Sequence, residues 1–122
     1  MRIRLVPAAA AVLVAAAAGQ ASVSAAAPQL VGTVGPGFTI TLTKGGKLVK
    51  ALKAGSYRFV VHDKASIHDF ALHQTSGGTL NKELTSVPFA GTKTITLKLG
   101  KGTYKYFCTP HQSIMSGSFK VS

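Results

Sequence analysis

The chain has 122 residues, of which 14 are Lys or Arg and only 3 are Asp or Glu, so its formal net charge is +11. This length allows one small domain and is too short for two. The positive charge favours an acidic partner, and we expect no nucleic-acid binding because the lysines are scattered between apolar positions and the chain has features of an exported protein.

The first 26 residues have the pattern of a secretory signal peptide. Two arginines precede an apolar run over residues 5–18, which is too short to cross a membrane, and small residues suited to cleavage follow it. We expect cleavage after Ala25 or Ala26, leaving a bacterial protein that is secreted or periplasmic and has no membrane span. Loss of residues 1–26 leaves 96 residues and lowers the net charge from +11 to about +9.

The rest of the chain is predicted to be one domain of short strands. Residues 27–37, rich in Pro, Gly and Ala, are expected to be a flexible segment leading into a domain over residues 38–122. Apolar residues alternate with Thr over residues 38–43, which predicts a strand with Phe38 on its core face. Further strands are predicted over residues 48–52, 57–61, 67–73, 94–99, 103–108 and 118–121.

These strands are separated by Gly-containing turns, and no segment has a helical period of useful length. Residues 79–91 are expected to be irregular, with room for a short helical turn. Seven or so short strands in about a hundred residues predict an all-β fold, a Greek-key antiparallel β-sandwich in a single domain.

Cys108 is the only cysteine in the sequence. A lone cysteine is unusual in an exported protein, because oxidising compartments usually pair cysteines into disulfides. It ends a predicted strand in which the two-residue period puts Tyr104, Tyr106 and Cys108 on the inner face and Lys105 on the outer face. A buried, inert thiol is the simplest interpretation of Cys108 taken alone.

Two further metal-binding side chains follow within seven residues, His111 and Met115. A thiol, an imidazole and a thioether are ligands that suit copper. Pro110 fixes its own φ and favours an extended conformation at Thr109, so the loop between these residues is preshaped. The pattern indicates a copper site that needs one more imidazole from elsewhere in the chain.

The candidates for the second imidazole are His62, His68 and His73. His62 stands beside a predicted turn and His73 has outward parity, whereas His68 has the same inward parity as Phe70 and Leu72. Because a buried imidazole is costly unless it is hydrogen-bonded or ligated, we favour His68.

The sequence resembles the plastocyanin-like branch of the cupredoxins, the blue copper proteins, from about residue 38 to residue 121. The motifs that carry the resemblance are SIHDF (residues 66–70), VPFAGT (87–92) and GTYKYFCTPH (102–111), followed by Met115. The resemblance implies a cupredoxin fold with one copper ion in a type 1 site, enclosed by aromatic residues such as Phe70 and Phe107. The implied ligands are His68, Cys108 and His111 in the equatorial plane and Met115 on the axis, with the edge of His111 as the electron port.

Two features depart from the family pattern. Three residues separate His111 from Met115, as in azurins, while the spacing from Cys108 to His111 is that of plastocyanins. Asp69 stands where the family usually has Asn, and an ionised Asp side chain can only accept hydrogen bonds, although its backbone N–H can still reach the Cys108 sulfur. We expect Asp69→Asn to raise the reduction potential. Pro110 has no N–H to donate to the sulfur, so one means of tuning the site is missing.

The resemblance implies a small one-electron carrier and not an enzyme, because Phe107 and Thr109 flank Cys108 where copper enzymes of this fold have histidines. We expect a monomer that docks weakly with an acidic redox partner. One alternative is an extracytoplasmic protein that carries or sequesters copper without redox cycling. Another is a structural sandwich with an inert thiol.

Overall fold

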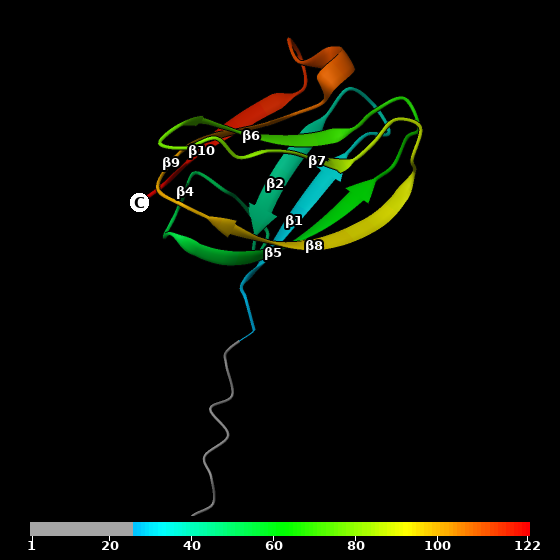
Figure 1. Cartoon of the computed structure of the whole chain (residues 1–122). Coiled ribbons are helices and arrows are strands. Elements are labelled where there is room, and N and C mark those ends of the chain that lie inside the picture. The colour runs from blue at the N-terminus through cyan, green and yellow to red at the C-terminus, as the bar shows by residue number, and fades with distance from the viewer. Residues whose placement is uncertain (1–25) are drawn as a thin grey trace, which may run out of the picture.

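A computed structural model describes residues 26–122 of the chain. Their ten strands form two facing five-stranded sheets (Figure 1). The first sheet has the order β3 (Lys47–Leu48), β2 (Ile40–Lys44), β1 (Gln29–Val34), β5 (Gly55–Asp63) and β8 (Gly91–Leu99). The second has the order β4 (Ala51–Leu52), β10 (Ser116–Val121), β9 (Gly102–Phe107), β6 (Phe70–Ser76) and β7 (Asn81–Thr85). A short 3₁₀ helix, η1 (Thr109–His111), connects β9 to β10.

The predicted all-β sandwich is confirmed, but its sheets are mixed instead of wholly antiparallel. β1 pairs with β5 in parallel and β10 pairs with β4 in parallel, while the other neighbouring strands are antiparallel. Strands joined by a tight hairpin must be antiparallel, whereas strands that are distant in the chain can pair in either direction. The turn signals in the sequence identify only the hairpin pairs, so they do not predict the two parallel pairs.

The segment leading into the domain contains a core strand, so its prediction as flexible is wrong. β1 lies between β2 and β5 and buries Leu30 and Val34 completely. Gly32 faces the second sheet, where a Cβ atom would lie 2.8 Å from the Phe70 ring. Gly32 therefore reflects a close approach between the sheets and not a flexible segment. The predicted signal peptide falls almost entirely on residues 1–25, which lie outside the described residues.

Two other boundaries differ from the prediction. Residues 79–91 contain a strand, β7, which pairs with β6 in an antiparallel arrangement. β6 begins at Phe70, so His68 precedes it in the connection from β5. Both differences arise because pairing with a neighbouring strand fixes where a strand begins, and the sequence pattern alone does not show the neighbour.

Aromatic and aliphatic side chains from both sheets fill the space between them. Tyr104 stacks on Phe119 with ring centroids 5.2 Å apart, and Phe70 stacks on Tyr106 at 5.9 Å. The alternation predicted for β8 is confirmed, because Leu97 and Leu99 are buried while the lysine between them is exposed. This packed core fixes the strand ends from which the loops at each end of the sandwich extend.

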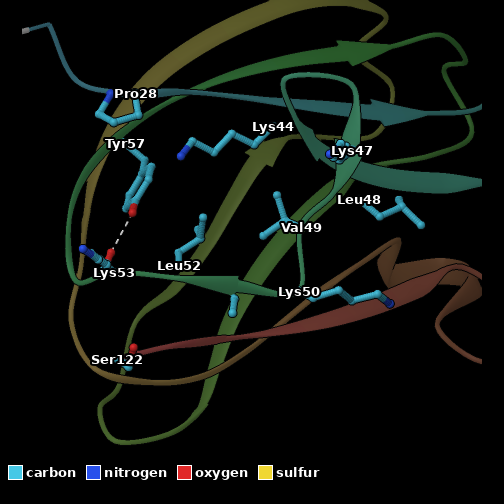
Figure 2. A pocket seen from close by; sticks show the side chains of 11 residues that line it. Pro28, Lys44, Lys47, Leu48, Val49, Lys50, Leu52, Lys53, Tyr57 and Ser122 are labelled. Carbon is cyan, nitrogen blue, oxygen red and sulfur yellow. Dashed lines mark hydrogen bonds between the residues drawn. The ribbon is translucent and has the colours of Figure 1, made fainter.

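The two ends of the sandwich have different chemistry. At one end, the β1–β2 loop, the β5–β6 connection and the loop after β9 bring His68, Cys108 and His111 together. At the other end, where β1 begins, four lysines line a groove (Figure 2). Within the described part of the chain, no helix has the length and apolar character needed to cross a membrane.

Candidate metal centre

Cys108 lies directly after β9, at the inner surface of the second sheet. Tyr104 and Cys108 are completely buried and Tyr106 is nearly so, while Lys105 on the opposite face is half-buried. The predicted inward face of this strand is therefore confirmed. Because the strand ends here, the sulfur lies at the edge of the core where the loops meet.

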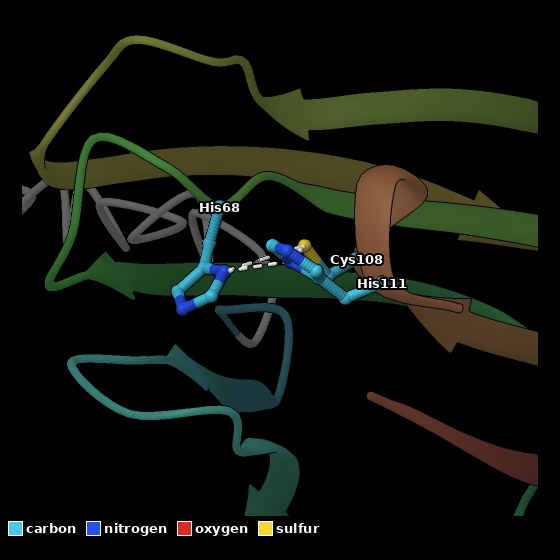
Figure 3. A group of neighbouring side chains, drawn as sticks. All are labelled: His68, Cys108 and His111. Carbon is cyan, nitrogen blue, oxygen red and sulfur yellow. Dashed lines mark hydrogen bonds between the residues drawn. The ribbon is translucent and has the colours of Figure 1, made fainter. Parts of the chain in front are cut away.

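Three potential metal-binding atoms converge at this point (Figure 3). The Nδ1 atoms of His68 and His111 are 3.2 Å apart. The Cys108 Sγ lies 3.6 Å from Nδ1 of His68 and 3.5 Å from Nδ1 of His111. Both imidazoles thus present the same ring nitrogen to the thiol, and the three atoms form a small, nearly equilateral triangle.

The dimensions of this triangle fit a metal ion at its centre. Typical bonds of about 2.0 Å to nitrogen and about 2.3 Å to thiolate, taken from zinc sites, place donors in a trigonal plane roughly 3.5 to 3.7 Å apart. The observed separations are within about 0.3 Å of these values. Two imidazoles and one thiolate form the trigonal donor set of a type 1 copper site.

Burial of the donors also favours a ligated state. His68 and Cys108 are completely inaccessible to solvent and His111 is half-buried. The second nitrogen of His68, Nε2, is buried and has no hydrogen-bond partner among residues 26–122. The ring is positioned by packing, because a Cβ atom on Gly35 would lie 3.1 Å from its Cδ2. Gly35 also has φ of +74°, a conformation that favours glycine.

Met115 closes the loop that begins at Cys108. The Met115 carbonyl accepts a hydrogen bond from the Cys108 backbone N–H at 3.0 Å, and its own N–H donates to the His111 carbonyl at 2.9 Å. The His111 N–H in turn donates to the Cys108 carbonyl at 3.0 Å. Met115 is completely buried, and Pro110 lies in the first turn of η1 with its side chain exposed. The thioether therefore belongs to the core beside the three donors.

Asp69 links the two loops that carry the histidines. Its carboxylate accepts hydrogen bonds from the Thr109 backbone N–H at 2.5 Å and from the Thr109 hydroxyl at 2.6 Å. Burial raises the pKa of the Cys108 thiol, and a hydrogen bond from the Asp69 backbone N–H opposes this rise. Direct contact of this N–H with the sulfur stays a prediction. The Asp69 carboxylate thus links the two loops as a hydrogen-bond acceptor, with Thr109 as the donor.

The carboxyl groups of the chain gather around Asp69. A hydrogen bond with Asp69 is the main reason that the pKa of Glu83 is raised. Burial raises the pKa of Asp63, which is only 2% exposed. Among residues 26–122, the buried Asp63 Oδ2 and Thr85 hydroxyl have no hydrogen bond of good geometry, although Thr85 is close enough to lower the pKa of Asp63. All three acidic side chains thus lie toward the end that holds the donor cluster.

Phe38 covers the outer side of the histidine pair. Its ring meets His68 edge to face with centroids 5.6 Å apart and meets His111 in the same way at 5.0 Å. The prediction that Phe38 is a core residue is wrong, because β2 begins two residues later and the ring is 56% exposed. Phe70 is buried as expected, but Phe107 faces outward beneath Lys105, whose Nζ lies 5.2 Å from the ring centroid.

The two other histidines lie outside this cluster. His62 points toward the surface, where its Nδ1 lies 3.0 Å from the Thr92 hydroxyl oxygen. His73 is exposed on the outer face of β6. The structure thus brings together the three donors favoured from the sequence and leaves out the two histidines judged less suitable. Phe38 is the neighbour of the site that the sequence pattern did not predict.

Comparisons with known proteins agree with this geometry. Residues 38–122 match the family model for copper-binding proteins of the plastocyanin/azurin family. Among solved structures, rusticyanin variants and reduced rusticyanin are similar at 21% and 20% sequence identity, each with a TM-score of 0.51. These matches cover 77% of this chain and 76% and 78% of the respective rusticyanin chains. A search of curated protein sequences gave no match.

The match to the family model covers most of the chain, and the solved structures show the same fold at low identity. The donor set is that of one type 1 copper ion, with Met115 placed consistently beside the three converging atoms. The chain therefore belongs to the plastocyanin/azurin family of copper-binding proteins, the cupredoxins.

Proposed function

We propose that this protein is an extracytoplasmic one-electron carrier that holds a single copper ion with His68, Cys108, His111 and axial Met115. The observation that carries the proposal is the convergence of Nδ1, Sγ and Nδ1 within 3.6 Å of one another in a buried site. Bound copper would supply a Cu(II)/Cu(I) couple in a geometry that both oxidation states tolerate.

The surrounding residues restrict movement of the donors. The sulfur follows a central strand of the second sheet, and the loop that carries His111 is closed by backbone hydrogen bonds between residues 108 and 115. The Asp69–Thr109 hydrogen bonds attach this loop to the His68 connection. Donors held in this way need little rearrangement when the charge at the site changes. That property supports electron transfer over a role in copper delivery, which requires a site that opens.

The exposed end of the site is suited to electron exchange. His111 is the half-buried donor, so its outer edge is the shortest route from the site to the surface. Phe38, Ile67 and Ile114 are 56%, 54% and 64% exposed near this end. An apolar rim of this kind favours short-lived contact with a partner protein, and the net charge of about +9 after signal removal favours an acidic one.

The same residues favour a carrier over an enzyme. Catalysis at copper needs an open position for substrate, whereas Phe38 covers the histidines and His68 and Cys108 are completely buried. Among residues 26–122, these three residues form the one group of metal-binding side chains, so the described chain offers no second centre to receive electrons. The signal-like pattern of residues 1–26 supports export to the periplasm or beyond.

The test is the visible spectrum and voltammetry of the Cu(II)-loaded protein beside two variants. The protein should show an intense thiolate-to-copper band that bleaches reversibly on reduction, and a one-electron couple with copper retained in both states. Cys108→Ser should abolish the band. The matched control His73→Gln, an exposed histidine away from the cluster, should leave it unchanged.

Two results would contradict the proposal in different ways. A colourless protein, or a band indifferent to Cys108→Ser, would show that the thiol is inert. A coloured protein that gives up its copper on reduction would indicate copper carriage or sequestration instead of electron transfer.

A further inference from the structure

A second candidate binding site lies at the end of the sandwich opposite the donor cluster. It is a groove of about 680 Å³ between the β2–β4 segment and the beginning of β5 (Figure 2). Val49 and Leu52 form its floor and are only 4% and 7% exposed, and the buried Tyr57 donates a hydrogen bond from its hydroxyl to the Lys53 carbonyl at 2.7 Å. The volume is typical of a ligand site, and the floor is apolar.

Four lysines surround this floor. They recur every third residue along one segment and all of them are exposed: Lys44, Lys47, Lys50 and Lys53. Figure 2 shows Lys44 extending toward Tyr57 along one side of the groove, with Val49 and Leu52 between the lysines. No acidic side chain lines the groove. The three Asp and Glu side chains lie toward the other end, so none of them balances the charge of these ammonium groups.

A single exposed lysine needs no explanation beyond keeping the protein surface hydrated. Scattered lysines on the outer faces of the sheets have that role. The concentration of four lysines at the end that lacks acidic side chains does need one. Four cations arranged around a depression that includes the exposed side chain of Leu48 combine two features that a solvating surface does not need, namely a concentration of positive charge and exposed apolar surface. A ligand that complements both features carries several negative charges and at least one apolar group.

The shape distinguishes between ligands of this chemistry. A flat membrane surface would meet the lysines and the exposed Leu48 but would not reach Val49 and Leu52 at the floor. Four separated ammonium groups match a series of carboxylates better than they match one anionic head group. An extended acidic peptide with a projecting apolar side chain fits both the rim and the floor.

We infer that this groove binds an acidic segment of a partner protein, with an apolar side chain of that segment inserted over Val49 and Leu52. The groove is separated from the donor cluster by the length of β1, which runs from beside Pro28 in the groove to Gly35 next to His68. Six strand residues span about 20 Å. The carrier can therefore be held at one end while His111 at the other end stays accessible.

Such an arrangement raises the local concentration of the carrier near its partner without obstructing electron exchange. Binding at the tethering end makes each contact at the other end effectively intramolecular. This inference goes beyond the proposed redox role and does not depend on it, because none of the described residues that line the groove is a candidate copper ligand.

The inference can be tested by NMR titration of the ¹⁵N-labelled, Cu(I)-loaded protein with a blocked octapeptide of sequence EDELFEDE at neutral pH and low salt. Amide shifts should concentrate in residues 44–53 and neighbouring Tyr57. A groove variant should bind the peptide at least about tenfold more weakly, because four charge contacts are lost. That variant carries Lys44→Gln, Lys47→Gln, Lys50→Gln and Lys53→Gln.

A matched variant keeps the net charge of the groove variant but changes exposed lysines elsewhere, namely Lys64→Gln, Lys82→Gln, Lys93→Gln and Lys98→Gln. It should weaken binding by less than about threefold, since long-range attraction alone is affected. Leu48→Ser and the serine-substituted peptide EDESSEDE test the apolar part of the interaction, and both should weaken binding. Leu48 is 54% exposed, so its replacement should not unfold the domain.

Three outcomes would overturn the inference. Equal loss of binding in the two lysine variants would show that attraction is nonspecific. Equal binding of the two peptides would show that the apolar floor has no role. Binding to vesicles of phosphatidylcholine and phosphatidylglycerol without binding to the peptide would make the groove a membrane-docking site. Repeating the titration without copper should give the same result, so failure of the redox proposal would leave this test intact.

Discussion

Asp69 and Thr109 are joined by two hydrogen bonds, one from the Thr109 backbone N–H and one from its hydroxyl, with both oxygens of the carboxylate as acceptors. The pair connects residues 40 positions apart in the chain. It fixes the connection that carries His68 against the loop that carries His111. The relative position of the two imidazoles therefore depends on one carboxylate.

Asp69→Asn should raise the reduction potential of the copper-loaded protein. The carboxylate stabilises the more positive oxidised site, and the amide removes that charge while its oxygen can still accept the Thr109 N–H. A change of roughly 1 kcal/mol corresponds to tens of millivolts for one electron. Voltammetry measures the shift, with His73→Gln, at an exposed residue outside the donor cluster, as the control. An unchanged or lower potential would contradict the prediction.

Thr109→Val should destabilise the copper-free protein. The substitution keeps the shape of the side chain and the backbone hydrogen bond but removes the hydroxyl donor, leaving one carboxylate oxygen without its partner. A hydrogen bond to a charged group contributes about 1.5 to 3 kcal/mol. Urea denaturation monitored by tyrosine fluorescence measures the loss. Thr75→Val is a suitable control, because its hydroxyl bonds at the exposed surface, and it should have a much smaller effect.

Phe38→Ala should lower the reduction potential and speed loss of copper to a chelator. The ring covers both imidazoles from outside, and its removal admits water, which stabilises the oxidised ion more than the reduced one. Leu48→Ala, at a side chain of similar exposure in the groove at the far end, should leave both properties unchanged. If the two variants behave alike, Phe38 has no shielding role.

Asp63→Asn should stabilise the protein at neutral pH. Burial raises the pKa of Asp63 above its ordinary value of 3.8, so the native state holds this proton more tightly than the unfolded state. The resulting penalty is absent below pH 3.8, grows as the pH rises to the raised pKa, and persists above it.

The asparagine variant avoids this penalty, keeps the acceptor for the Ala65 N–H and adds an N–H for the Thr85 hydroxyl. A gain of about 1 kcal/mol is expected at pH 7 and none at pH 3. Urea denaturation at both pH values checks this. A gain of the same size at both would show that improved hydrogen bonding, and not the carboxylate charge, is responsible.

Much of the candidate site could be predicted from the sequence because its residues obey the two-residue period of strands. Parity placed Cys108 with Tyr104 and Tyr106, and it placed His73 on the exposed face of β6. It also favoured His68, but this residue precedes β6, so the connection from β5 and not the strand period determines its position. The same rule, applied to Phe107 beside Lys105, would have shown that this ring faces outward. The expectation that Phe107 encloses the metal is therefore wrong, because the ring lies on the face of Lys105.

The remaining features depend on contacts that no local pattern encodes. Phe38 continues the alternation of β2 but lies beyond the point where pairing with β1 ends, so it is free to turn toward the histidines. β1 has the composition of a loop because Gly32 must accommodate Phe70 from the other sheet. The Asp69–Thr109 pair joins segments whose proximity follows only from the complete fold.

The loop from Cys108 to Met115 is shaped by its own backbone, and this has a consequence for evolution. The hydrogen bond from Cys108 to Met115 continues the register of β9 and β10, in which Phe107 pairs with Ser116. A residue gained or lost inside the loop would change the spacing of the donors without displacing either strand. Natural variation can thus alter the geometry of the metal site while the two strands still pair as before.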